Sequence, residues 1–565
     1  MVASTHWLAS ASGMAVLECG GNAFDAAVAA GMVLHVVEPH LNGVGGDLPL
    51  IGRAAGGEPF VLCGQGTSPA AASAERFRHL GLDVIPGTGL LAAVVPGAFG
   101  TWLDLLARYG TWHLADVLSF AIGYARSGYP LVPQAAATIG AVASLFREHW
   151  PSSAQTYLHD GVPAPMSRFA NPVLADTLER IVAEARAAGP SREAEIEAAR
   201  RAFYTGFVAE AIEAFCAREV MDSSGAPHRG LLTADDLAAW RVREEAPVSL
   251  DFAGHTILKT GPWGQGPVLL QQLAMLAGMG LSDTRPGTAE LVHAVVETAK
   301  LALADRDAWY GDPDRVDVPL EGLLTEPYLT ARRAMVEARA SDELRPGQPG
   351  AIAPRLPEIA DAGPRSPMGI GEPTRGDTCH LDVVDAAGNI VSATPSGGWL
   401  QSSPTVPGLG FQLPTRAQMF WLEQGLPGSL TPLTRPRTTL SPTLILGDAT
   451  IACGTPGGDQ QDQWQIPFLL NHLVYGMNLQ EAVDAPSWHT THLISSFEPR
   501  TIDRRGVHAE SRLDQDVLEA LRERGHRVTD AGPWSLGRIS AVAHRDGMLY
   551  GAANPRGMQG YAVGR

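Results

Sequence analysis

The sequence predicts an α+β protein in which a helix-rich first part precedes a strand-rich last part. An Ala/Val-rich run over 22–34 and apolar periodicity over 176–188 and 193–215 predict helices. From His380 onward, apolar and polar residues alternate, which is typical of strands. Only one clear break in composition, at 346–376, separates the two parts.

Local signals place the other elements. Thr233-x-x-Asp236 ahead of Leu237 is a capping box, a pattern that opens a helix. Residues 439–446 and 449–453 predict strands, and an amphipathic helix is expected from Leu513 to Glu523.

A β-hairpin is expected directly after the composition break. Two short apolar runs, 381–385 and 390–394, flank a Gly/Asn-containing turn. If Asp385 faces Ile390, counting back along both arms places Thr378 opposite Gly397 and beside Ser396. A slip of one or two residues would change this pairing.

Composition and charge exclude several classes of protein. The chain has 565 residues, 45% of them apolar and 18% charged, and is therefore long enough for a deep core. A net charge of −18 repels phosphate backbones and anionic lipid, so neither nucleic acid nor a membrane is an expected partner. No apolar run approaches the ~20 residues of a membrane-spanning helix. Because the first residues also lack the pattern of a signal peptide, we expect a cytoplasmic protein.

Metal and cofactor motifs are not found in the sequence. The five cysteines lie far apart and never as CxxC, which argues against a disulfide framework or a zinc site. His489-Thr-Thr-His492 could face a metal from one side of a helix, but no nearby Asp, Glu or Cys completes a ligand set. Serine-elbow, zincin, P-loop and complete dinucleotide-binding motifs are missing as well. We therefore expect no metal and no cofactor.

The composition break itself points to a reaction. Residues 346–376 contain seven prolines and six glycines without periodicity, as in a loop or linker, and end at Asp377-Thr378. A threonine hydroxyl is a weak nucleophile, but a free α-amino group with a pKa of ~7.7–8.0 can serve as its base. Cleavage between Asp377 and Thr378 would create that group. The alternative is a threonine that simply begins a strand.

A second feature suits the same chemistry. In Gly454-Thr455-Pro456-Gly457-Gly458, two consecutive glycines after a strand can turn their N–H groups toward one point, as an oxyanion hole requires. A Gly-Gly pair is also a common turn, so this signal counts only together with Thr378.

Motifs along almost the whole chain resemble the γ-glutamyltranspeptidase family of N-terminal nucleophile hydrolases. Thr378-x-His380 resembles the start of the family's small subunit, and Thr455-Pro456-Gly457-Gly458 its oxyanion motif. The remaining matches follow in the family's order: Gly20-Gly21-Asn22-Ala23-x-Asp25, Glu38-Pro39-His40-x-Asn42-Gly43-x-Gly45-Gly46, Val95-Pro96-Gly97, Phe203-Tyr204-x-Gly206, Leu231-Leu232-Thr233-x-Asp235-Asp236-Leu237 and Pro436-x-Thr438-Thr439-x-Ser441-Pro442-Thr443.

This resemblance implies a four-layer α/β/β/α sandwich and a proenzyme that cuts itself. Residues 1–377 would form the large subunit, with 346–377 as its Pro/Gly-rich linker, and 378–565 the small subunit, together one folded unit. Thr378 would be the nucleophile and its α-amino group the base. Ser396 would hydrogen-bond to the nucleophile, and Gly457 and Gly458 would donate to the oxyanion.

The substrate side departs from the family pattern. The arginine that grips a γ-glutamyl α-carboxylate is replaced by Gln65, the family's loop asparagine falls at Gly398, and its aspartate falls near Gln418 or Met419. Loss of such partners weakens binding of a glutamyl group. The stretch around Trp399 is more similar to the branch that contains oxamate amidohydrolase, and a bulky Trp399 suits a smaller pocket.

The sequence therefore predicts a self-processing threonine amidohydrolase acting on a small carboxylate-bearing amide, with water or an amino acid as acceptor. A cation for that carboxylate is sought among Arg416, Arg435 and Arg437. The substrate-binding residues we expect are Thr438, Thr439, Gln65, Gly398, Trp399 and Arg437.

Several alternatives stay open. The first is a γ-glutamyltransferase or glutathione hydrolase, and acylation chemistry on cephalosporin side chains is a more distant one. A further alternative is an uncut, non-catalytic binding protein with the same fold. The partners expected of an enzyme are its own two fragments as a heterodimer, with a dimer of these as a further option.

Overall fold

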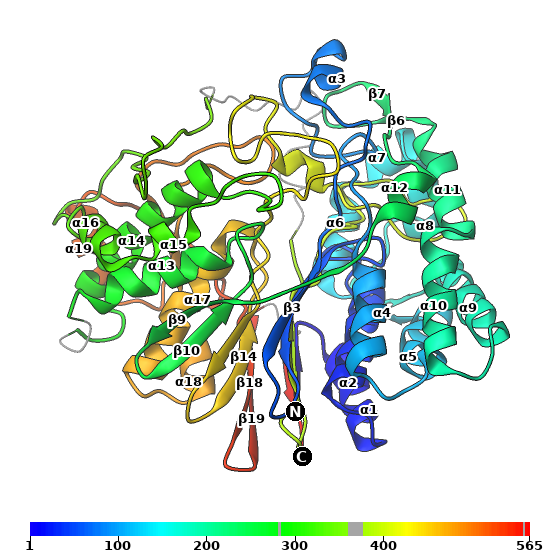
Figure 1. Ribbon diagram of the computed structural model, residues 1–565, viewed down its shortest axis with the longest axis horizontal. Helices are drawn as coiled ribbons and strands as arrows, with labels where there is room; N and C mark the ends of the chain where they lie inside the picture. Colours follow the sequence, from blue (N-terminus) through cyan, green and yellow to red (C-terminus); the bar gives the residue numbers. More distant parts are fainter. Residues whose placement is uncertain (281–283, 360–376, 557–559) are drawn as a thin grey trace.

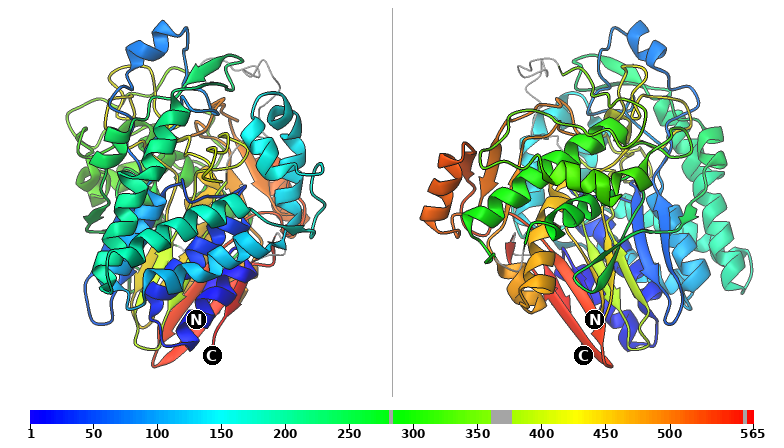
Figure 2. Two further views of the ribbon diagram at one scale, coloured as in Figure 1. Left: turned by 90° about the vertical axis from the view of Figure 1, so that its right-hand side faces the viewer. Right: turned by 60° about the vertical axis from the view of Figure 1, so that its left-hand side comes forward.

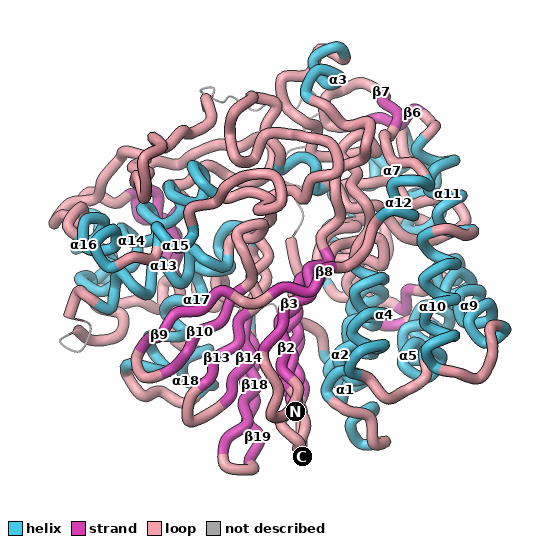
Figure 3. Tube along the Cα trace, in the orientation of Figure 1, coloured by secondary structure: helices cyan, strands magenta, loops and turns pink. Residues whose placement is uncertain are grey.

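The computed structural model describes residues 1–280, 284–359, 377–556 and 560–565. Two β-sheets lie face to face at its centre, with helices on their outer sides (Figures 1 and 3). The seven-stranded sheet has the order β20 (Tyr561–Val563), β1 (Val2–Ser4), β11 (Leu381–Val384), β12 (Ile390–Ala393), β2 (Leu48–Arg53), β3 (Pro59–Gly64) and β8 (Arg243–Glu245). The six-stranded sheet has the order β19 (Met548–Ala553), β18 (Ser540–Arg545), β14 (Thr450–Gly454), β13 (Thr443–Leu446), β10 (His255–Lys259) and β9 (Val248–Phe252).

Helices from the first half of the chain lie on the seven-stranded sheet. Of these, α2 packs on β11 and β12, α4 on β3, and α1 on β1 and β20. The helices on this side are α1 (Trp7–Glu18), α2 (Ala23–Val37), α4 (Ala98–Tyr109), α5 (Leu114–Ser127), α9 (Pro172–Ala187), α10 (Arg192–Tyr204), α11 (Phe207–Cys216) and α12 (Ala234–Ala239).

The six-stranded sheet carries a second group of helices, which comes forward in the right-hand view of Figure 2. α13 packs on β9 and β10, and α18 packs on β19. The group comprises α13 (Gly266–Ala277), α14 (Ala289–Trp309), α15 (Leu320–Leu323), α16 (Glu326–Arg333), α17 (Gln461–Leu469), α18 (Leu479–Asp484) and α19 (Gln515–Glu523).

Further short α-helices and strands lie outside these layers, in addition to the short helical segments η3 (Arg416–Met419), η4 (Gly458–Gln460) and η5 (Leu470–Val474). They are the helices α3 (Ala74–His79), α6 (Pro133–Ala141), α7 (Ala143–Glu148) and α8 (Pro151–Tyr157), and the minor strands β4 (Tyr129–Pro130), β5 (Arg168–Phe169), β6 (Glu219–Met221), β7 (Pro227–Arg229), β15 (Trp488–Thr490), β16 (Gly506–Ala509) and β17 (Arg527–Asp530). None of the helices in this part combines the length and the apolar character that crossing a bilayer requires.

Apolar side chains fill the space between the two sheets. Ile51 and Val384 from the seven-stranded sheet belong to one buried cluster with Leu258, Leu444 and Val542 from the six-stranded sheet. Separate clusters join each sheet to its own helices. The predicted α+β class is therefore confirmed as a mixed fold of several sheets and helices.

The helix predictions hold, with one correction. α2 begins with a capping box formed by Asn22 and Asp25, and α12 with one formed by Thr233 and Asp236. The segment 193–215, expected as one helix, divides into α10 and α11. The break falls at Thr205 and Gly206, where the backbone leaves the helical conformation.

The hairpin forms as predicted, but its register differs by one residue from the expected pairing. Val384 pairs with Ile390, and the Asp385 N–H donates to the carbonyl of Asn389. The turn is therefore one residue shorter than assumed, because the Asp385 carboxylate accepts hydrogen bonds from the N–H groups of Ala387 and Asn389 and closes it tightly. As a result Thr378 pairs with Ser396 rather than with Gly397.

Candidate active site

Thr378 and Ser396 lie at the open end of the hairpin, where the two arms still pair as an isolated antiparallel bridge. Both side chains are buried, and their hydroxyl oxygens are 3.1 Å apart. The Ser396 hydroxyl also lies 3.0 Å from the carbonyl oxygen of Asp377, which can only accept. Ser396 therefore donates to this carbonyl, and its oxygen is left to accept the proton of Thr378.

A second donor contacts the same carbonyl. The indole Nε1 of Trp399 lies 2.7 Å from the Asp377 oxygen and 2.8 Å from the Leu41 oxygen, so its N–H is shared between the two. The Trp399 ring is buried against Phe497, with the ring centres 6.1 Å apart. The peptide bond between Asp377 and Thr378 is thus held by two donors on its oxygen and has a hydroxyl next to it.

Gly457 and Gly458 follow β14 and both have positive φ, at 126° and 56°. A Cβ on Gly457 would lie 2.1 Å from the Trp464 ring, and one on Gly458 would lie 3.2 Å from the Phe497 ring. Only glycine suits the first position, because the nearby atom belongs to a buried indole. Within the described residues neither glycine N–H has a hydrogen-bond acceptor, so both are available to a ligand.

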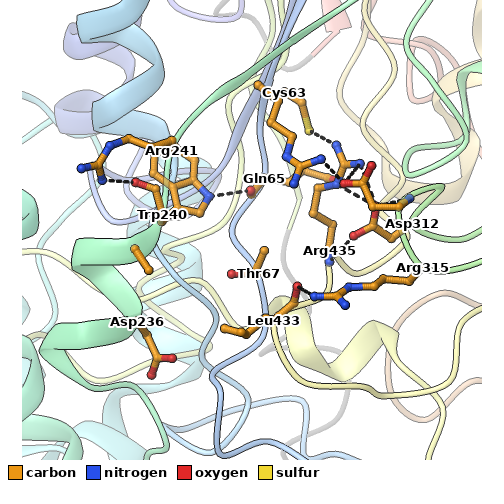
Figure 4. A pocket seen from close by; sticks show the side chains of 13 residues that line it. Cys63, Gln65, Thr67, Asp236, Trp240, Arg241, Asp312, Arg315, Leu433 and Arg435 are labelled. Carbon is orange, nitrogen blue, oxygen red and sulfur yellow. Dashed lines mark hydrogen bonds and ion pairs between the residues drawn. The ribbon is translucent and has the colours of Figure 1, made fainter.

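Two of the expected substrate-side residues, Gln65 and Thr438, contact each other, and Thr439 follows directly in the chain. The amide of Gln65 donates to the hydroxyl of Thr438, and both side chains are buried. The hydroxyl of Thr439 is buried and has no partner among the described residues. Gln65 also borders a cavity of about 280 Å³, shown in Figure 4 together with Trp240, Asp312 and Arg435. A neutral amide therefore stands where the family pattern has a cation.

Gly398 has no room for the side chain that the family carries at this position. Its φ is 65°, and a Cβ would lie 3.1 Å from both the Gln412 carbonyl oxygen and the Gly46 nitrogen. Because these neighbours are backbone atoms, they cannot rotate away. Gly398 therefore contributes backbone alone.

Two of the three arginines considered for a substrate carboxylate have carboxylate partners within the protein. Arg416 makes two hydrogen bonds to Asp47, at 2.8 and 3.2 Å. Arg435 contacts Asp312 at 2.7 Å, Glu245 at 2.5 Å and Asp314 at 3.3 Å. Both arginines are buried in ion pairs that stabilise the fold, and the Nη1 of Arg416 has no partner among the described residues.

Arg437 is the least neutralised of the three. It donates to the Ser496 hydroxyl at 2.8 Å, whereas Asp307 lies 3.6 Å away and is shared with Arg306. Burial, followed by the positive charge of Arg306, lowers the pKa of Arg437 to about 10. Ser496 also donates to Asp459, the residue after Gly458, which places Arg437 on the glycine side of the site.

Glu38 is a buried carboxyl group next to the nucleophile. In the sequence it stands out only as the first residue of the Glu38-Pro39-His40 motif, which says nothing of this role. Glu38 accepts hydrogen bonds from the thiol of Cys379 at 2.9 Å and the hydroxyl of Thr5 at 2.7 Å. Burial raises the pKa of Glu38 to about 7, since neither of these donors is charged. The buried Cys379 is therefore a hydrogen-bond donor.

His380 and His489 have hydrogen-bond partners within the protein. His380 is buried between Thr394 and Asp382, at 3.0 Å from each, as expected of a packed side chain. His489 lies on β15 rather than on a helix, and it accepts from the Trp464 indole, so the proposed metal-facing pair with His492 is wrong.

One further group has metal-like composition. His293, Glu297 and His526 lie close together, but the two imidazoles hydrogen-bond to each other at 2.8 Å. Glu297 is paired with Lys300 at 2.5 Å and Arg345 at 3.2 Å. Each of the three groups therefore has a partner within the protein, although the Nδ1 of His526 has none among the described residues.

Comparison with known proteins defines the class. The family model described as Gamma-glutamyltranspeptidase matches residues 9–564, and the chain belongs to this family. Its members are hydrolases and transferases that act on amide bonds.

Individual relatives cover nearly the whole chain. It is 31% identical to the glutathione hydrolase-like YwrD proenzyme of Bacillus subtilis, covering 100% of this chain and 98% of that protein. Identity to the oxamate amidohydrolase proenzyme of Klebsiella pneumoniae is 32%, covering 98% and 97%. The solved structure of LmbA2991HD is 52% identical with a TM-score of 0.94, covering 100% of this chain and 98% of that one. The motif-based family prediction is thus confirmed, while the relatives' names span different substrates.

Proposed function

We propose that this protein is a self-processing threonine amidohydrolase with the four-layer α/β/β/α sandwich of N-terminal nucleophile hydrolases. Residues 1–377 become the large subunit and 378–565 the small one. Both sheets draw strands from the two parts: β1 pairs with β11, β2 with β12 and β10 with β13. The cut fragments therefore stay together as a heterodimer, since separating them would break every one of these ladders.

The single observation that carries the proposal is the set of contacts on the Asp377 carbonyl. The Ser396 hydroxyl at 3.0 Å and the Trp399 indole N–H at 2.7 Å polarise this carbonyl. The Thr378 hydroxyl is hydrogen-bonded to the same Ser396. Donors preplaced on a carbonyl oxygen stabilise the negative charge that develops when a nucleophile attacks. A strand-initiating threonine has no need of this arrangement.

Self-cleavage follows as an N-to-O acyl shift. The Thr378 oxygen bonds to the Asp377 carbonyl carbon while its proton passes to Ser396, and the Ser396 proton passes to the carbonyl oxygen. The C–N bond then breaks, the nitrogen takes up the proton, and an ester joins Asp377 to the Thr378 oxygen. Water hydrolyses this ester, which leaves an Asp377 carboxylate and a free Thr378 amine.

Substrate turnover uses the amine that cleavage releases. The α-amino group accepts the proton of the Thr378 hydroxyl as it attacks the substrate amide. Gly457 and Gly458 donate their free N–H groups to the oxyanion. An amine or ammonia leaves, and water, or an amino acid in a transfer reaction, then clears the ester from Thr378.

A small amide that carries a carboxylate is the substrate class we favour. Gln65 is neutral and already bonded to Thr438, so the usual grip on a γ-glutamyl carboxylate is missing. Gly398 presents backbone only, and Trp399 fills space next to the scissile bond. Among the arginines of the sequence hypothesis, Arg437 is the one left to meet a carboxylate, with Thr439 beside it. The similarity to oxamate amidohydrolase supports this choice.

Hydrolysis or transfer of γ-glutamyl compounds is the second candidate. The similarity to a protein named glutathione hydrolase-like favours it. An uncut, non-catalytic binding protein is a third, but it leaves the contacts around Asp377 without a purpose.

The test is a substrate panel on protein whose cleavage has been verified. Oxamate, glutathione and a γ-glutamyl anilide are incubated with the enzyme, and released ammonia, glutamate or aniline is measured. We expect turnover of the small carboxylate amide, with Thr378→Ala protein as the inactive control. Turnover of glutathione alone would instead select the second candidate.

A further inference from the structure

The residue on the acyl side of the scissile bond is itself an acidic one. The Asp377 carboxylate forms an ion pair with Arg538, 161 residues away. Asp377 is the only hydrogen-bond and ion-pair partner of Arg538 among the described residues, although the charge of Arg538 also acts on the buried Glu38 and His40. Both side chains are partly exposed, at 32% and 23%, so this pair is accessible and not locked into the core.

A cavity of about 430 Å³ adjoins this ion pair. Asp377 and Arg538 line it together with His40, Trp464 and Trp534. His40 is 2% exposed, and neither of its ring nitrogens has a hydrogen-bond partner among the described residues. Burial, followed by the charge of Arg538, lowers the pKa of His40 to about 3, so the ring is neutral and keeps an N–H to donate. Buried polar atoms without partners are uncommon, and here they border an open space.

The chemistry of self-cleavage indicates a function for the cavity next to Asp377 and Arg538. The ester that joins Asp377 to the Thr378 oxygen has the same form as the acyl-enzyme made from a substrate. In that ester the acyl group is Asp377, so its side chain marks where an acyl substituent goes. When the cut chain end departs, Arg538 loses its carboxylate, and the volume of the Asp377 side chain joins the cavity.

We propose that Arg538 is the carboxylate-binding residue of the acyl pocket, and that Asp377 occupies this site in the uncut chain as a substrate-like plug. The inference rests on the proposed amidohydrolase function and narrows its substrate class. Two carbons separate the carbonyl from the carboxyl carbon in Asp377. The acyl group that fits best is therefore of the succinamate type, with a carboxylate at that distance from the amide.

The proposal is tested by ligand binding to uncut chains, which requires no catalysis. Thr378→Ala protein keeps Asp377 on Arg538, whereas the double variant Asp377→Ala/Thr378→Ala exposes the guanidinium. Binding of succinamate is measured by calorimetry, with neutral succinamide as the isosteric control. We expect binding of succinamate to the double variant and at least about tenfold weaker binding to Thr378→Ala protein.

Four added substitutions, made one at a time in the double variant, identify the cation. Arg538→Met removes the charge and should weaken succinamate binding about tenfold or more, whereas Arg538→Lys should restore part of it. Arg437→Met tests the other candidate, and Arg512→Met is the matched control because its guanidinium lies 3.2 Å from the centre of the Trp534 ring. Thermal unfolding without ligand establishes that each variant is folded.

The outcomes separate this inference from the proposed function. Equal binding with and without Arg538, equal binding to the two uncut parents, or loss with Arg437→Met alone would overturn the Arg538 assignment. Wild-type self-cleavage and amide turnover would still stand in each of these cases. Conversely, Arg538-dependent binding in a protein that never cuts itself would keep the site and reject the amidohydrolase.

Discussion

Arg435 and Arg538 are both paired with carboxylates, but their partners have different fates. Arg435 is buried among Asp312, Glu245 and Asp314, and none of the three is near a bond that breaks. The Arg538 side chain is partly exposed, and its ion-pair partner Asp377 lies on the acyl side of the proposed cleavage site. An arginine that keeps its carboxylate partners, such as Arg435, stabilises the fold. An arginine that would lose its partner through the proposed self-cleavage, such as Arg538, becomes free to bind a substrate carboxylate.

The largest effect is expected when self-cleavage is prevented, because the chain end at Asp377 then cannot leave. Thr378→Ala removes the attacking hydroxyl, so the chain should stay whole and Asp377 should remain on Arg538. Thr378→Ser keeps a hydroxyl and should still cut. On a denaturing gel, cleavage gives fragments of 377 and 188 residues, at about 40 and about 20 kDa. Active, cut Thr378→Ala protein would contradict the assignment.

The two arginines should differ sharply in stability. Arg435→Met leaves Asp312 and Glu245 without their cation, whereas Asp314 keeps Arg243, and should lower the free energy of unfolding by about 3–5 kcal/mol. In the uncut Thr378→Ala chain, where Asp377 still pairs with Arg538, Arg538→Met breaks a partly exposed pair and should cost less than about 1 kcal/mol. Denaturant unfolding of both variants measures the difference. Similar losses for the two would remove the distinction between a structural and a binding cation.

Glu38 extends the comparison to a buried acid that accepts hydrogen bonds from the uncharged side chains of Cys379 and Thr5. Its pKa is raised from 4.5 to about 7 by burial, so the folded state holds an extra proton between these values. The free energy of unfolding should therefore fall by about 3 kcal/mol as pH rises from 4.5 through 7.

Glu38→Gln removes this titration. The stability of the variant relative to wild type should increase across the same pH window and level off above it. Denaturant unfolding at several pH values gives the difference. A difference independent of pH would mean that Glu38 is ionised in the folded protein throughout.

The Trp399 indole shows the same contrast in a single N–H group, since Leu41 would stay and Asp377 would leave after the proposed cleavage. Trp399→Phe keeps the ring but loses the N–H, and should slow self-cleavage about a hundredfold. Trp102→Phe is the matched control, because it removes a buried indole N–H that donates to His35. Fragment formation over time is the measurement, and equal rates in the two variants would exclude the indole from the reaction.

Local patterns predicted much of the fold and part of the site. The capping boxes of α2 and α12, the hairpin and the Gly457-Gly458 turn follow from residues close together in sequence. The register was missed by one residue because the Asp385 side chain, rather than the Gly/Asn pair alone, closes the turn.

Contacts between distant segments could not be predicted in this way. Asp377 and Arg538 are 161 residues apart, and Cys379 and Glu38 are 341 apart. No periodicity or spacing relates such pairs, because the packing of the two sheets brings them together. The same holds for Arg416 and Arg435, whose partners became known only from the fold.

The central claim is that Thr378 becomes a chain terminus by its own attack on Asp377. Intact-mass analysis of purified protein that hydrolyses an amide measures this directly. If the chain is cut between Asp377 and Thr378, the spectrum contains a 188-residue fragment whose mass corresponds to a start at Thr378. Amide hydrolysis by a preparation that contains only the uncut 565-residue chain would contradict it.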